Sequence, residues 1–219
     1  MTEDKIHPPI ATGVVLGDMT THVAGFVRYA LASDQHKPGI YYFAILACAC
    51  FLESVLEEFT HLWCATKATQ DQGFESRLMD VIAQDVSRAT GLDPWKKWLN
   101  TLYGIDFPKT AGEDWKTLDV LFKLRNQMAH GRTTKFTHYW NAHDGRFMGM
   151  TLEGSSYELP FKHLIEKKVM NVPKGEIPNA DLLLTRRVTQ YFWETVDRTI
   201  ASLQKVPELS GLRDGVRKT

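Results

Sequence analysis

Residues 115–131 read WKTLDVLFKLRNQMAHG, and this stretch decides how the rest of the chain is interpreted. Its apolar side chains recur at the spacing of one helix face, at Trp115, Leu118, Leu121, Phe122 and Met128. Gly131 follows at the position where a helix commonly ends in a left-handed cap. A helix is therefore predicted from Trp115 to His130, and Arg125 and His130 are polar positions near its end.

The sequence on both sides predicts a helical bundle. Further helices are expected over residues 18–32, 40–67, 74–90, 95–103, 161–170 and 179–205. Gly91 and Gly104 are expected to end helices. Asp93 and Asn179 are expected to act as N-caps.

Residues 136–150 follow a different pattern, because their side chains alternate on both sides of a turn at 143–145. This alternation predicts a β-hairpin, with 157–159 as a candidate third strand. The predicted fold class is all-α (mainly): a helical bundle with a small β-hairpin insertion, about 133–160, before the C-terminal helix.

The composition indicates one ordinary globular domain. Of 219 residues, 43% are hydrophobic, and a single helical domain is expected over 18–205, between an irregular N-terminal segment (1–17) and a flexible tail (206–219). The start of the chain does not resemble a signal peptide, and the longest apolar run, 39–52, is too short to cross a bilayer. The three cysteines all lie in one apolar stretch and suit a reducing compartment. We expect a cytoplasmic protein with no membrane partner.

The chain carries a local positive patch although its 26 basic and 26 acidic residues cancel. From residue 120 to 142 no Asp or Glu occurs, whereas several cations and aromatic side chains do. The candidate RNA-binding residues are Lys123, Arg132, Lys135, His138, Tyr139 and Trp140. The alternative is that the aromatic side chains of the hairpin simply pack on the bundle.

Residues 124–131 (LRNQMAHG) resemble the Arg-x4–6-His motif of HEPN domains, in which Asn, His or Asp commonly follows the Arg. The resemblance extends to the layout over about 19–205: a long early helix carrying Glu53, a later helix that ends in the motif, and a long final helix. It implies a metal-independent endoribonuclease without cofactors, of the kind found in toxin–antitoxin, phage-defence and CRISPR systems. It also implies a homodimer, RNA as substrate and an antitoxin or defence-system partner. Some relatives are inactive binding modules.

The residue types suit RNA cleavage without a metal ion. His130 can transfer a proton near neutral pH, and Arg125 stays charged and can bind two phosphate oxygens. Five residues along a helix turn the side chain by about 140°, so Arg125 and His130 do not share a face. Asn126 and His130, four residues apart, do share one. Two motifs facing each other across a dimer are therefore expected to surround the phosphate.

Glu53 is the remaining candidate for the catalytic group of Arg125, His130 and Asn126. It extends the apolar face formed by Tyr42, Leu46 and Ala49, so it is expected to hold Arg125 or to orient His130. The alternative is that the helix emerges into water at this point.

Other patterns are weaker. HEPN toxins paired with nucleotidyltransferase antitoxins commonly carry a Tyr two residues after the His, and Arg132 stands there in this chain. The histidines match no common zinc spacing, so no metal site is expected. Two rival functions remain beside RNA cleavage: an inactive HEPN module that binds RNA, a nucleotide or a partner protein, and a structural cap buried in a dimer interface.

Overall fold

The computed structural model describes residues 17–33, 37–70, 74–86, 88–129, 137–140, 143–145, 147–151, 157–172, 180–207 and 209. Most of the described residues lie in helices, which confirms the all-α fold class. The described part contains α1 (Gly17–Ala32), α2 (Pro38–Gln70), α3 (Phe74–Val86), α4 (Leu92–Tyr103), α5 (Phe107–Ala111), α6 (Asp114–Ala129), β1 (Thr137–Trp140), β2 (Phe147–Thr151), α7 (Glu158–Glu166), a 3-10 turn η1 (Ala180–Leu183) and α8 (Arg186–Leu203).

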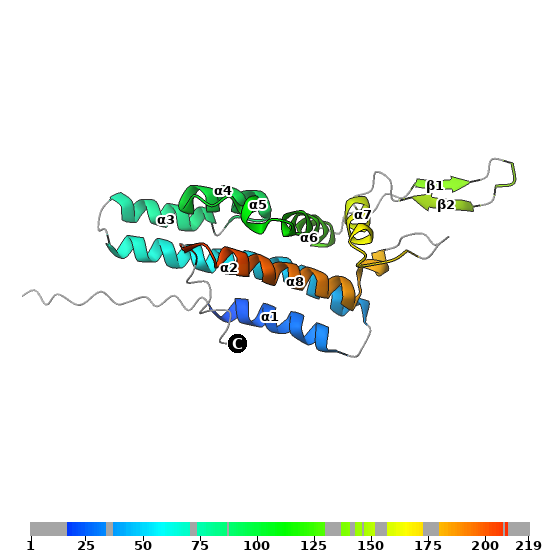
Figure 1. Cartoon of the computed structure of the whole chain (residues 1–219), viewed down its shortest axis with the longest axis horizontal. Helices are drawn as coiled ribbons and strands as arrows, with labels where there is room; N and C mark the ends of the chain where they lie inside the picture. The colour runs from blue at the N-terminus through cyan, green and yellow to red at the C-terminus, as the bar shows by residue number, and fades with distance from the viewer. Residues whose placement is uncertain are drawn as a thin grey trace, which may run out of the picture.

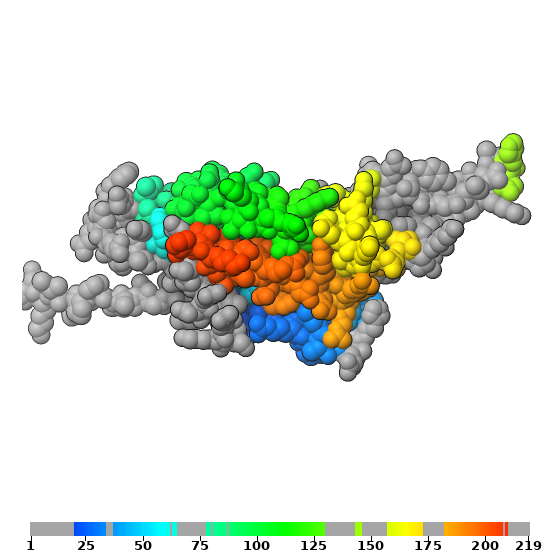
Figure 2. All heavy atoms as spheres, in the orientation of Figure 1, coloured from blue at the N-terminus to red at the C-terminus, as the bar shows by residue number. Residues whose placement is uncertain are grey.

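Helix α2 is the centre of the bundle. It packs against α1, α3, α6 and α8, and in Figure 1 it runs almost the whole length of the helical body. With 33 residues it is about 50 Å long. Its buried side chains join those of α6 and α8 in one core that includes Ile45, Leu52, Leu121 and Phe192. In the space-filling view, α4 to α8 form one continuous face, with α7 seated over the start of α8 (Figure 2).

The apolar segment of α2 is longer than the sequence suggested. Pro38–His61 is 24 residues long and is long and apolar enough to cross a membrane by length and composition alone. Half of its most apolar window is buried inside the bundle. The expectation that this region is too short to span a bilayer is therefore wrong on length.

Helix α4 begins earlier than the sequence predicted. Its N-cap is Gly91, with φ 88° and ψ 175°, and Asp93 lies inside the first turn instead of capping it. Helix α3 already ends at Val86, so Gly91 does not end it. The prediction for Gly104 is confirmed, because this glycine ends α4 with φ 67° and donates its N–H to the Asn100 carbonyl at 2.9 Å.

Three further elements of secondary structure differ from the predictions. Helix α5 was not predicted, although Asp106 accepts a hydrogen bond from the Lys109 N–H at 3.3 Å in an ordinary N-cap. Residues 157–159 are not a strand, because α7 starts at Glu158. Helix α8 starts only at Arg186, where Thr185 caps it, and the predicted cap Asn179 lies outside the described residues.

Strands β1 and β2 lie between α6 and α7 in the sequence. They pair antiparallel, from Thr137 opposite Thr151 to Trp140 opposite Phe147, with a register shift at Tyr139/Trp140. The remainder of the region 130–156 is described only at 143–145. Residues 1–16 and 210–219 also lie outside the description, but Leu209 is fully buried, so the packed part of the chain extends beyond the predicted limit at 205.

Candidate functional site

Glu53 is the junction of three helices. It lies on α2, and one carboxylate oxygen accepts a hydrogen bond from the Gly91 N–H, at the start of α4, at 2.6 Å. The other oxygen accepts one from Nη2 of Arg125, on α6, at 2.9 Å. Its side chain is only 13% exposed. The expectation that Glu53 holds Arg125 is confirmed, and the alternative of a helix emerging into water is wrong.

Arg125 is held from a second side. Its Nη1 donates to Oδ1 of the neighbouring Asn126 at 2.8 Å, and its side chain is 18% exposed. These two bonds use two of the five N–H groups of the guanidinium and fix its plane. The Arg125 fork is therefore orientated before any ligand arrives, which is what a phosphate-binding group requires.

Burial dominates the electrostatics of this site. It raises the pKa of the Glu53 carboxyl, while the Gly91 N–H and Arg125 oppose the rise. Burial also raises the pKa of the half-buried Cys50 thiol, with Arg125 opposing. Cys50 therefore borders the site, whereas Cys48 is fully buried. An ion pair whose desolvation outweighs its attraction adds little stability, so stability alone does not explain why Glu53 and Arg125 meet here.

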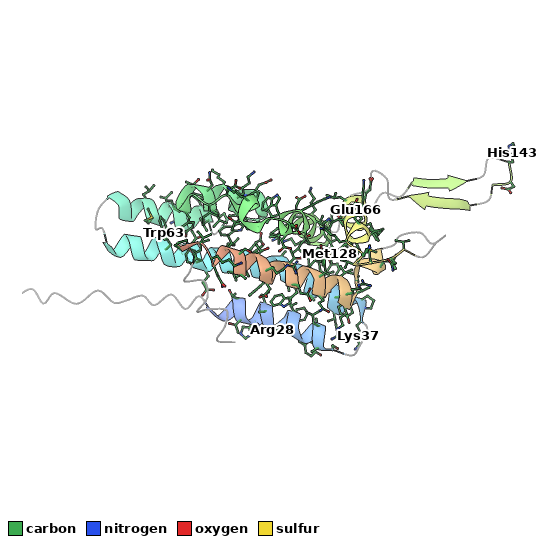
Figure 3. All side chains as sticks on the ribbon, in the orientation of Figure 1. Arg28, Lys37, Trp63, Met128, His143 and Glu166 are labelled. Carbon is green, nitrogen blue, oxygen red and sulfur yellow. The ribbon has the colours of Figure 1, made fainter. Side chains whose placement is uncertain are left out.

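The end of α6 is fixed to the same face of α2. The Tyr42 hydroxyl donates to the Met128 carbonyl at 2.6 Å, and this carbonyl belongs to the last turn, where helix carbonyls lack intrahelical partners. Met128 lies where α6 meets the layer of α2 and α8 (Figure 3). Tyr42 and Glu53 thus attach α6 to α2 at residues 128 and 125. The sequence placed Tyr42 on the apolar face that leads to Glu53 but did not reveal its hydrogen bond, and Gly91 was expected only to end a helix, not to donate to Glu53.

The remaining predicted residues are placed only in part. His130, Arg132 and Lys135 lie outside the described residues. The backbone of 138–140 belongs to β1, but the side chains of His138, Tyr139 and Trp140 are not described. Figure 3 shows His143, in the turn after β1, well away from Met128 and the end of α6.

Lys123 contributes less positive charge than the sequence suggested. It is exposed on α6 and pairs with Asp119 at 2.7 Å. Asp119 stands one residue before the acid-free window of the sequence, and the helix brings it next to Lys123 because the two are four positions apart. The charge of Arg125 is likewise balanced by Glu53, so the patch on α6 is close to neutral.

No protein-family model, no curated protein and no solved structure matches this chain. The residues themselves must therefore carry any functional argument. What they provide is a pre-orientated Arg–Asn pair, a carboxylate that holds it, and a helix end fixed next to the position of His130.

Proposed function

We propose that this chain is a metal-independent endoribonuclease of the HEPN type that works as a cytoplasmic homodimer, as a toxin or phage-defence effector. The observation that carries the proposal is the Arg125 fork, which Glu53 and Asn126 hold at 2.9 and 2.8 Å just before the helix end that leads to His130. This arrangement positions a permanent cation for a phosphate, and a histidine follows Arg125 five residues later in the sequence.

The proposed reaction is attack of a ribose 2′-oxygen on the adjacent phosphorus. The phosphorus–5′-oxygen bond breaks, and the products are a 2′,3′-cyclic phosphate and a free 5′-hydroxyl. One His130 takes the 2′-hydroxyl proton and the other supplies the proton to the leaving oxygen. Arg125 stabilises the charge that develops on the phosphate oxygens, and Asn126 and Glu53 position Arg125. Two chains are proposed because a spacing of five residues corresponds to about 140° on a helix, so one copy of the sequence motif is not expected to surround a phosphate.

The test is cleavage of total cellular RNA in the presence of a chelator, with the product ends mapped. His130→Ala is expected to abolish cleavage and to leave the helical content and the dimer unchanged. Arg125→Lys keeps the charge but cannot form bidentate hydrogen bonds to a phosphate, so it is expected to reduce cleavage strongly. Arg198→Lys is the matched control, because Arg198 also joins two helices by binding a carboxylate, that of Asp114, at 2.7 and 3.1 Å.

Cleavage that persists in purified His130→Ala, or that requires a divalent ion, contradicts the assignment. A second function, RNA binding without cleavage, is favoured by one observation: because Arg125 is paired with Glu53, it can still donate to a phosphate but stabilises less of the charge that develops during cleavage. In that case wild type and His130→Ala bind RNA, neither cuts it, and loss of Arg125 changes affinity only. The antitoxin of such a system is not expected to act by modifying a tyrosine after the motif, because Arg132 occupies that position.

A further inference from the structure

A second polar site lies where the end of α7 meets the start of α8 (Figures 1 and 2). It is a hollow of about 360 Å³, a size at the lower end of the range for ligand pockets. It is lined by Lys167, Lys168, Val169, Arg187, Gln190, Tyr191 and Glu194. Three cations and one carboxylate leave the lining with an excess of two positive charges.

Lys168 has an unusual backbone. It directly follows the C-cap of α7 and has φ 57°, and it is the only non-glycine residue with a positive φ among those that the structure describes. Glycine is the usual residue at this position, since a side chain strains the left-handed conformation. The Lys168 carbonyl accepts a hydrogen bond from Nη2 of Arg187 at 2.6 Å. The strained turn thus brings two cations together.

Tyr191 forms an aromatic wall of the hollow. Its hydroxyl points inward, to Oγ1 of Thr117 at 3.0 Å, and Thr117 in turn lies 3.0 Å from Nε2 of the buried His163. Because the Tyr191 hydroxyl is engaged by Thr117, a ligand in the hollow can contact Tyr191 only through its ring. A ring of fixed orientation beside several cations is the pattern that binds a nucleotide, with the base against the ring and the phosphate on the cations.

We propose that the α7–α8 hollow binds one nucleotide unit, with Lys167, Lys168 and Arg187 on its phosphate and Tyr191 against its base. The unit is either part of a single RNA strand or a free mononucleotide. Thr117, beneath Tyr191, precedes Arg125 by eight residues on α6, about 12 Å along the helix axis. If the bound unit is part of an RNA strand, the inference rests on the proposed endoribonuclease function, and the hollow is then a second binding site for the RNA substrate.

The experiment measures binding to the full-length protein, so it does not depend on cleavage. Fluorescence anisotropy follows a labelled 2′-O-methyl RNA 12-mer, which cannot be cut by 2′-hydroxyl attack, over a range of salt concentrations. Phosphorus NMR follows adenosine monophosphate. Lys168→Gly removes one cation and also the backbone strain, so this variant is expected to fold with a melting temperature no lower than that of wild type. Lys162→Gln, an exposed lysine of α7 outside the hollow, is the matched control.

For RNA we expect Lys168→Gly to weaken binding severalfold and to reduce the slope of log K against log salt by about 0.7, the value of one phosphate contact on a single strand. Tyr191→Leu is expected to weaken RNA binding without changing this salt slope. Loss of adenosine monophosphate binding in Lys168→Gly, with RNA binding unchanged, assigns the hollow to a free nucleotide. The proposal is overturned if Lys168→Gly and Lys167→Gln bind both ligands like wild type, or if Lys162→Gln has the same effect as they do. A failure of RNA cleavage leaves these results unaffected, so the two proposals fail separately.

Discussion

Replacing Glu53 by leucine removes a carboxylate from the junction of α2, α4 and α6 and leaves two groups without their partner. The Gly91 N–H loses an acceptor at 2.6 Å, and the guanidinium of Arg125 loses one at 2.9 Å. Replacing both charged residues, Glu53→Leu with Arg125→Met, leaves no unpaired charge. The two changes together therefore separate the cost of an orphaned charge from the value of the pair.

The magnitudes follow from burial. Breaking a fully buried ion pair costs about 3–5 kcal/mol, and this pair keeps 13% and 18% of its side-chain surface exposed, so we expect about 2–3 kcal/mol for Glu53→Leu. In a chain of this size that lowers the melting temperature by roughly 4–12 °C. The double variant is expected to recover the part of this loss that comes from the orphaned charge, because two well-packed apolar side chains replace a pair whose desolvation is costly. The Gly91 N–H still lacks its acceptor in the double variant, at a cost of about 1 kcal/mol.

The assay is urea unfolding followed by circular dichroism for wild type, both single variants and the double variant. Asp119→Ala is the matched control, because its pair with Lys123 also involves α6 but is 51% and 41% exposed, and we expect a loss of about 0.5 kcal/mol or less. A loss of stability for Glu53→Leu no larger than that of Asp119→Ala would contradict the expected cost of an orphaned charge. So would effects of the two single variants that simply add in the double variant.

Two further predictions concern neighbouring contacts. Burial, with Lys116 and Lys167, lowers the pKa of His163 below its ordinary value of 6.5, so the folded state binds fewer protons than the unfolded one below that pH. The free energy of unfolding should therefore decrease as the pH drops below 6.5. Urea unfolding at pH 7.5 and pH 5 should show a smaller decrease for His163→Gln than for wild type, and equal decreases would contradict this. Tyr42→Phe should cost about 1 kcal/mol through the lost bond to the α6 end and speed amide exchange there, whereas Tyr29→Phe, 64% exposed, should change neither.

Local signals in the sequence were enough for most helices. The spacing of apolar residues in α6 and the glycine at position 104 depend on the chain's own periodicity and conformational preference, so they could be predicted from the residues nearby. The same kind of signal is present for α5, since Asp106 and Pro108 form a cap and a first turn. The predictions that failed were those of helix boundaries that depend on contacts between residues far apart in the sequence.

The start of α4 is the clearest case. Asp93-Pro94 is a good local start signal, yet the helix begins at Leu92 with Gly91 as its N-cap, two positions before the predicted cap, because Glu53, 38 positions away, accepts the N–H of Gly91. The contact between Glu53 and Arg125 could be predicted because both lie on helix faces that had to meet. The hollow between α7 and α8 could not, since its cations come from a strained turn and a helix start that only the folded chain brings together.

The geometry of Gly91 also sets a rule for finding other chains with this site. The conformation of Gly91, with φ 88° and ψ 175°, is essentially restricted to glycine. Proline is excluded for two reasons, because its ring fixes a negative φ and because it has no N–H to donate to Glu53. A chain that shares the arrangement should therefore carry a glutamate, a glycine and an Arg–Asn pair in this order. Here the glycine stands 38 positions after the glutamate and the arginine 72. The lengths of the segments between them can vary, but these four residue types cannot vary independently, so they form a signature that can be searched without the histidine.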